Sequence, residues 1–245
     1  MTGERTVGRR SVPGTDRTAS VLGVSVELPP IAPPEADRQL VALLRKARGE
    51  GVTVFDVGGS NSPARAEHLV ATAFPQHDPE LLIIVRGALP TSHMPRPSAT
   101  TMPVPADPRV LDGLRTRLTK SRARLAPQTP GILEWGVDEA NPEELSLILP
   151  ALESLRSAGE VTGWSLRLRP DREALGAHLA HDRPKLISTE LSLLDPLLTA
   201  YLEAQAGTAE FGAFVRGPFA GGLLDGTRFT SALSDRSPRS APIDV

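Results

Sequence analysis

The stretch GVTVFDVGGSNSPARAEHLVATA, residues 51–73, decides the fold class of this chain. It opens with the apolar run VTVFDV, which ends near Asp56 and is followed by two glycines. A short apolar run closed by glycine is typical of a strand that is buried on both faces. The stretch as a whole therefore predicts a strand, a loop and a helix in sequence.

The same unit recurs along the chain. Short apolar runs bounded by Gly, Pro or charged residues predict further buried strands: VLGVSVEL at 21–28, LLIIVRG at 81–87, GILEWGV at 131–137 and FGAFVRG at 211–217. Amphipathic patterns between the strands predict helices at 35–48, 108–125 and 143–157, each followed by a glycine or another break. Strands that alternate with helices favour right-handed crossovers and a parallel sheet, as in a (β/α)8 barrel.

The ordered set of motifs resembles the aldo-keto reductase superfamily. Residues 51–73 match the family pattern GVxxFDTAxxYGxxxSExxxG, and Asp56 and Glu67 stand in place. STELSLLD at 188–195 resembles the family's QxEYNLLD, and FGAFVRGPFAGGLLDG at 211–226 resembles its seventh strand and SPLAxGLLTG loop. These segments span residues 21–226 in the family's order, which implies a TIM-type (β/α)8 barrel of aldo-keto reductase type.

The resemblance also implies that the catalytic tetrad is degenerate. Asn61 stands at the position of the proton-donating Tyr, and an amide has no titratable proton. Arg86 replaces the Lys, and a guanidinium cannot trade protons with a neighbour. Counting along the fourth strand puts Trp135 at the His position, whereas a slip of one residue puts Glu134 there. Only Asp56 of the four is retained.

The cofactor positions implied by the resemblance are altered as well. Leu166 and Arg167 stand in place of the Ser-Asn pair that holds the nicotinamide, Ser188 replaces a Gln, and Leu191 replaces the stacking Tyr. No motif for the 2′-phosphate of NADPH is visible after residue 226. We therefore expect no cofactor, and a barrel that is shortened, incomplete or irregular at its last β/α unit.

Composition fits one barrel domain. With 245 residues, 40% of them hydrophobic, the chain can bury a single sizeable core. We expect a flexible leader at 1–18, the barrel at 19–230 and a flexible tail at 231–245. The absence of cysteine excludes disulfides and thiolate chemistry, and a net charge of −2 gives no electrostatic footprint for nucleic acid. Without a membrane-length apolar run or the apolar core of a signal peptide, a cytoplasmic bacterial protein is expected.

The polar residues at the predicted strand ends are the candidate site, because strand ends converge at the C-terminal mouth of such a barrel. We expect Asp56 and Arg86 to form an ion pair, which could be purely structural. In the functional interpretation, Arg86 and Arg167 bind a carboxylate or enolate oxygen, while Glu190 or Glu134 moves a proton. The catalytic candidates are thus Asp56, Arg86 and Glu190, and the substrate-binding candidates are Asn61, Glu134, Trp135 and Arg167.

Other chemistry has little support in the sequence. The two histidines of HLAH at 178–181 have no further ligand nearby, so no metal site is expected. No GxGxxG, GxxxxGK or GxSxG motif occurs. The segment 88–107, rich in Pro, Ser and Thr, reads either as a long loop over the barrel mouth or as an ordinary connection.

Three functions follow, in order of preference. The first is an enzyme repurposed to cofactor-independent chemistry on a small biosynthetic intermediate, as a lyase, dehydratase, isomerase or cyclase of bacterial secondary metabolism. The second is a non-catalytic pseudo-reductase that binds a small molecule or a protein. The third is a divergent NADPH-dependent oxidoreductase. A homodimer or the chain's own tail is expected to cover the edge left by an incomplete barrel.

The replaced cofactor positions generate the first testable prediction. Calorimetric titration with NADPH or NADH should show no binding at physiological concentrations, because Leu166, Arg167, Ser188 and Leu191 lack the groups that hold the nicotinamide in the family. A dissociation constant in the low micromolar range would contradict this prediction.

Overall fold

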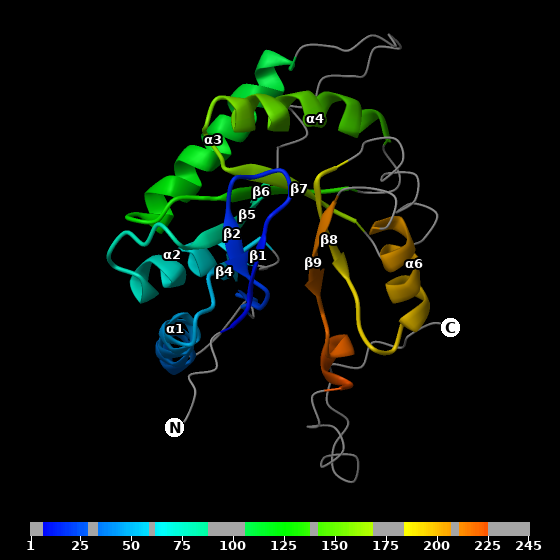
Figure 1. The fold of residues 1–245 in the computed structure, drawn as a ribbon. Coiled ribbons are helices and arrows are strands. Elements are labelled where there is room, and N and C mark those ends of the chain that lie inside the picture. Colours follow the sequence, from blue (N-terminus) through cyan, green and yellow to red (C-terminus); the bar gives the residue numbers. More distant parts are fainter. Residues whose placement is uncertain are drawn as a thin grey trace.

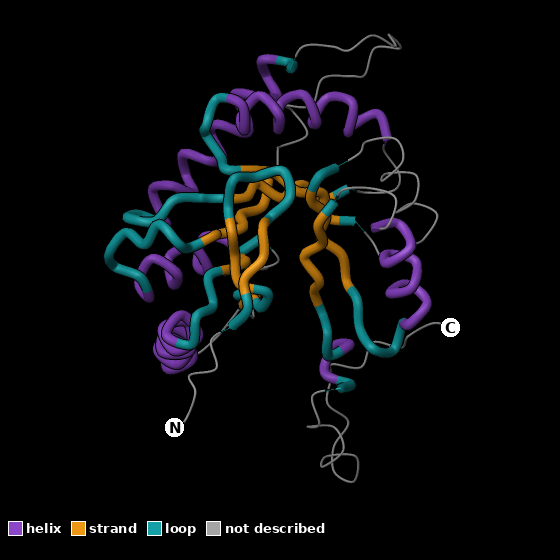
Figure 2. The backbone as a smooth tube through the Cα atoms, viewed as in Figure 1, coloured by secondary structure: helices purple, strands orange, loops and turns teal. Residues whose placement is uncertain are grey.

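The computed structural model describes residues 7–28, 34–58, 62–87, 106–137, 142–168, 184–206 and 211–224. Its centre is a parallel sheet of seven strands that lie side by side in sequence order (Figures 1 and 2). The strands are β3 (Gly23–Ser25), β4 (Val54–Asp56), β5 (Leu82–Gly87), β6 (Ile132–Gly136), β7 (Gly163–Arg167), β8 (Leu186–Glu190) and β9 (Gly212–Arg216).

This order confirms the predicted fold class. Each strand pairs in parallel with the next one along the chain, as in the strand ladder of a TIM-type barrel. Within the described residues, β3 and β9 are the two edges of the sheet and do not pair with each other. The barrel is therefore incomplete at its last β/α unit, as the sequence predicts.

Helices lie outside the sheet in the order expected for βαβ units (Figure 1). Each of those described opens with a proline, whose fixed φ and missing N–H suit the first helical position: α1 (Pro34–Gly49), α2 (Pro63–Ala73), α3 (Pro108–Leu125), α4 (Pro142–Ser157) and α6 (Pro196–Ala206). A short 3-10 turn, η2 (Ala220–Gly222), follows β9. None of the described helices combines the length and apolarity that a membrane crossing needs.

Side chains of successive strand residues alternate between two cores. Leu133 and Trp135 of β6 belong to the large core between the sheet and the helices. Ile132 belongs to a smaller core inside the barrel, together with Leu82, Ile84 and Leu186 of the neighbouring strands. Because the side-chain period of a strand is two, this alternation fixes which polar residue at each strand end faces the interior.

Residues 7–20 form a hairpin against the N-terminal end of the barrel, which corrects the prediction of a flexible leader at 1–18. Strand β1 (Arg9–Ser11) pairs antiparallel with β2 (Thr18–Ser20). Its turn packs so closely on the sheet that a Cβ on Gly163 would lie 2.6 Å from Thr15 Cγ2. Val12 and Ala19 of the hairpin are buried in the smaller core inside the barrel, so contacts with the barrel order the hairpin. The predicted tail at 231–245 lies outside the described residues.

A buried carboxylate joins two helices outside the sheet. Glu67 of α2 is fully buried and pairs with Arg117 at 3.0 Å and with Arg124, both from α3. It also accepts a hydrogen bond from Ser121 Oγ at 2.6 Å. Glu67, retained from the family pattern, therefore has a structural role in fastening α2 to α3.

The two sheet edges carry exposed apolar side chains. Val21 and Leu22, next to β3, are 52% and 61% exposed, and Val215 of β9 and Phe219 just after it are 47% and 57% exposed. Unpaired strand edges with apolar side chains are usually covered in native proteins.

We therefore predict that a second copy or residues 225–245 cover this edge. Sedimentation should show either a homodimer, or a monomer that aggregates once the chain is cut after Leu224. A full-length monomer whose truncated form also stays monomeric and soluble would contradict both forms of this prediction.

Candidate active site at the strand ends

A buried arginine between two carboxylates forms the centre of the strand-end site. The Nη2 atom of Arg216, at the end of β9, lies 2.6 Å from Asp56 Oδ2 and 2.7 Å from Glu134 Oε2. Arg216 is 9% exposed, Asp56 5% and Glu134 1%. The three side chains come from β9, β4 and β6, so they meet across the barrel interior rather than along one face.

The partner of Asp56 is thus Arg216, and the prediction that Asp56 pairs with Arg86 was wrong. Arg86 lies on β5 between the two acidic strands, but it is exposed. Inward-facing side chains at a barrel mouth can reach strands that are far apart in the sheet, and Arg216 does so. The signal was present in the sequence, since Arg216 ends the apolar run FGAFVRG just as Arg86 ends LLIIVRG.

The alternation of side chains along β6 determines whether Glu134 or Trp135 faces the barrel interior. Glu134 faces the interior and contacts Arg216, whereas Trp135 packs in the outer core with the helices. Of the two residues that the sequence offered for the family's His position, Glu134 is therefore the one that faces inward. The prediction that Trp135 binds substrate was wrong, because its ring lies on the opposite side of the sheet.

Burial disturbs the ionisation of both carboxyl groups. Desolvation raises the pKa of Glu134, and Arg216 opposes this increase only in part while the charge of Asp56 adds to it. Desolvation likewise raises the pKa of Asp56 against the lowering effects of Arg216 and of the Gly58 amide, which donates to Asp56 Oδ1 at 2.8 Å. One guanidinium therefore serves two buried carboxyl groups and does not fully compensate either.

Several buried polar atoms in the interior have no hydrogen-bond partner within the described structure. They are Glu134 Oε1, Arg216 Nη1, Ser165 Oγ and Ser188 Oγ. Ser165 is the register partner of Glu134 on β7, and the hydroxyl of Ser188 on β8 contributes to the electrostatics of Glu134. Buried polar groups are nearly always satisfied in native proteins, so donors and acceptors left open here point to a bound group.

The remaining predicted residues in the described part of the strand ends lie closer to solvent than this cluster does. Arg167 and Glu190 approach to 3.8 Å, and the Glu190 side chain is 65% exposed. Arg86 is exposed as well, and Asn61 lies outside the described residues, as does most of the segment 88–107. Of the predicted catalytic set, only Asp56 therefore belongs to the buried cluster. Among the predicted substrate-binding residues, Glu134 belongs to it and Arg167 lies nearby.

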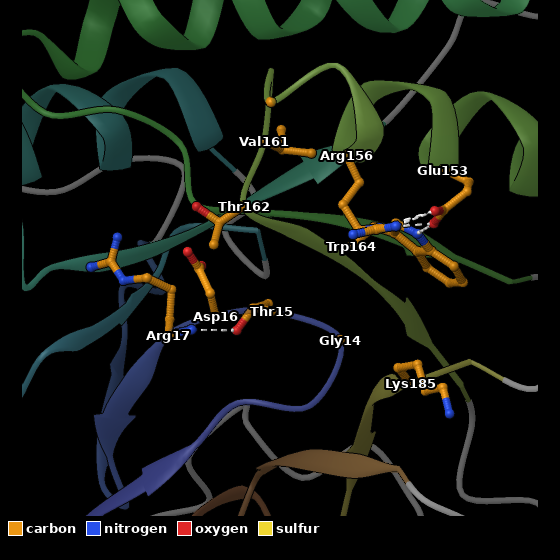
Figure 3. Close-up of a pocket in the computed structure, with 11 residues that line it drawn as sticks. Gly14, Thr15, Asp16, Arg17, Glu153, Arg156, Val161, Thr162, Trp164 and Lys185 are labelled. Atoms are coloured by element: carbon orange, nitrogen blue, oxygen red, sulfur yellow. Dashed lines mark hydrogen bonds and ion pairs between the residues drawn. The ribbon is translucent and has the colours of Figure 1, made fainter.

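A depression lies at the opposite, N-terminal end of the barrel (Figure 3). It has a volume of about 1020 Å³ and lies between the turn of the β1–β2 hairpin, the end of α4 and the first residues of β7 and β8. Glu153 accepts hydrogen bonds there from the Trp164 indole at 3.1 Å and from Arg156. None of the residues predicted for the site lines this depression.

Parallel strands in sequence order, outer helices and charged groups at the strand ends define a TIM-type (β/α) barrel. Comparison with solved structures shows which barrel it is. An aldo-keto reductase from Klebsiella pneumoniae in complex with NADP and acetate superposes with a TM-score of 0.65 and 17% identity, covering 91% of this chain and 73% of that one. The glycerol dehydrogenase from Gluconobacter oxydans superposes with a TM-score of 0.64 at 17% identity, and the match covers 100% of this chain and 70% of that one.

An aldo-keto reductase from Bacillus halodurans, in its holo form, gives a TM-score of 0.63 at 16% identity and covers 97% of this chain and 71% of that one. The chain therefore has the aldo-keto reductase fold, and the resemblance seen in the sequence is confirmed at that level. No family model matches the sequence, and no curated protein matches it by sequence comparison.

The buried cluster generates a stability prediction. Arg216→Met should cost about 3–5 kcal/mol, because it leaves two buried carboxyl groups without a cation. Glu134→Gln should cost far less, since Asp56 still neutralises Arg216. Urea unfolding at pH 7 measures both. Equal losses for the two variants would show that the ion cluster is not organised around Arg216.

The raised carboxyl pKa values predict a pH dependence. The folded state holds these protons more tightly than the unfolded state does, so the free energy of unfolding should fall as pH rises from the ordinary carboxyl range through the raised pKa. Glu134→Gln removes one such group and should flatten the profile. A profile that is unchanged in Glu134→Gln would contradict the assignment of the raised pKa to this residue.

Proposed function

We propose that this protein is a cofactor-independent enzyme that uses general acid–base chemistry at the strand-end site, as an isomerase, dehydratase, lyase or cyclase. The observation that carries the proposal is Glu134: a carboxyl group that is 1% exposed, next to a fixed cation and with one oxygen unpartnered. A buried carboxyl with a raised pKa keeps its proton to a higher pH than a solvated carboxyl does, which suits a general acid–base catalyst.

The proposed roles follow from the contacts. Glu134 moves the proton, and Arg216 provides a fixed positive charge for an oxygen that becomes negative during the reaction. Asp56 orients Arg216 through its ion pair. Glu190 was the alternative proton carrier, but its side chain is 65% exposed and lies outside the buried cluster, beside Arg167. Arg86 is also exposed, so it is not assigned a catalytic role.

A redox function receives less support. The structures compared above include reductases with NADP or NADPH bound, and that binding is a property of those proteins. In this chain Leu166, at a nicotinamide-holding position, packs in the outer core. Its side chain therefore points away from the mouth, where a cofactor would lie.

A non-catalytic binding module is the second candidate, and one observation favours it. The charged groups of the mouth pair with one another, since Arg216 contacts two carboxylates and Arg167 lies 3.8 Å from Glu190. A mouth filled by its own ion pairs is expected of a pseudo-enzyme. The unpartnered atoms of Glu134 and Arg216 favour catalysis instead, because a purely structural cluster would satisfy them.

Proton exchange in D₂O tests the acid–base function without knowledge of the substrate. The protein would be incubated with a panel of small oxo, hydroxy and unsaturated acids, and loss of C–H signals would be followed by ¹H NMR. We expect exchange in at least one class. Glu134→Gln should slow it by about 10²–10⁴-fold, the usual contribution of a positioned acid or base.

The matched control is Glu203→Gln, which removes an exposed carboxylate on α6. It should leave the exchange rate unchanged, and Glu190→Gln should reduce it less than tenfold. Equal rates in the wild type and Glu134→Gln would remove Glu134 from the mechanism. Absence of exchange across the whole panel would favour the binding module.

A further inference from the structure

The interior cluster, defined here as Glu134, Ser165, Ser188 and Arg216, carries an inference about the ligand. Each of these side chains is at least nine-tenths buried and has a polar atom without a hydrogen-bond partner in the described structure. The open donors are Arg216 Nη1 and the two serine hydroxyls. Three donors that include a guanidinium N–H match the two oxygens of a carboxylate, which accept several hydrogen bonds.

Gly58 leaves one side of the cluster free of a side chain. A Cβ at this position would lie 3.2 Å from Asp56 Oδ1 and 3.5 Å from Glu134 Oε1. Any other residue would therefore place an apolar group against the oxygens of both acids. The glycine keeps the approach to Glu134 Oε1 open for a small group.

The charged groups around Glu134 determine how the site can accommodate the negative charge of a bound carboxylate. Asp56 on β4 adds a negative charge, and Arg216 on β9 and Arg167 on β7 add positive charge. The other neighbours of the cluster that contribute no charge are Ser165, Ser188 and the backbone near Gly58. Glu27 adds negative charge near Asp56. Arg86, the register partner of Glu134 on β5, is exposed. A third carboxylate beside the single buried guanidinium would leave a buried negative charge uncompensated.

We propose that the interior cluster binds the carboxylate end of a small organic acid, and that Glu134 takes up one proton when it binds. The ligand then replaces Glu134 as the second negative partner of Arg216, so binding adds no further buried negative charge. Neutral Glu134 becomes an O–H donor beside the bound acid. This inference rests on the proposed function, because it supplies that function with a substrate class and with the acid that reacts.

Binding of acetate and formate over a range of pH tests the proposal, with NMR titration as the measurement. Because one proton enters with each carboxylate, Kd should rise about tenfold per pH unit above the Glu134 pKa and level off below it. Glu134→Gln should bind acetate with a Kd independent of pH. Acetamide, which has the same shape without the charge, should bind more weakly and without pH dependence.

Paired variants locate the site on the interior face. Ser188→Ala removes an inward hydroxyl and should weaken acetate binding about tenfold or more, the usual effect of losing a hydrogen bond to a charged group. Thr189→Val removes the buried hydroxyl of the next residue, on the opposite face of β8, and should leave Kd unchanged. Gly58→Ala should weaken binding by filling the approach.

Three outcomes overturn the inference. They are a Kd that does not change with pH in the wild type, acetamide binding as tightly as acetate, and no binding of either probe, which would mean that the cluster holds water only. Each is distinguishable from failure of the proposed function. If acetate binds with proton uptake but no C–H exchange occurs, the carboxylate-binding inference stands and the protein is a binding module. If C–H exchange occurs without carboxylate binding, the proposed enzyme function stands and the carboxylate-binding inference fails.

Discussion

One guanidinium shared between two buried carboxyl groups constrains the rest of the strand-end site. Arg216 comes from the last strand of the sheet, and Asp56 and Glu134 come from its second and fourth strands, so the contact ties distant strands across the barrel interior. Such a cluster is expensive to desolvate, and it is retained where its geometry is good or where it serves chemistry. Its open hydrogen-bonding atoms distinguish it from a purely structural ion pair, since fastening alone would leave none of them free.

The cluster also shows how the strand ends of a barrel bring buried charged groups from distant strands together. The fold fixes the positions at which strand ends converge, and the residues at those positions determine the chemistry. Here a carboxyl group, a guanidinium and two serines occupy the inward positions. The proposed function assigns proton transfer to these buried groups.

The fold was largely predictable from the sequence, because strands and helices have different hydrophobic periods and the motifs kept their order. The helices predicted at 108–125 and 143–157 match α3 and α4 to within one residue. The site was less predictable. A count along 131–137 could not decide whether Glu134 or Trp135 faces inward, because that depends on strand register, and ion-pair partners depend on reach across the barrel.

The N-terminal hairpin has a consequence for how the chain folds. Ser20 hydrogen-bonds Thr53 early in the sequence, while Gly14 and Pro13 press against Lys185 and Gly212 near its end. The surface on which the hairpin packs is therefore incomplete until β8 and β9 have formed. The hairpin precedes β8 and β9 in the chain, so its contacts beside those strands form only after they have been synthesised. Pairings so distant in sequence slow folding, because the loop between them must close first.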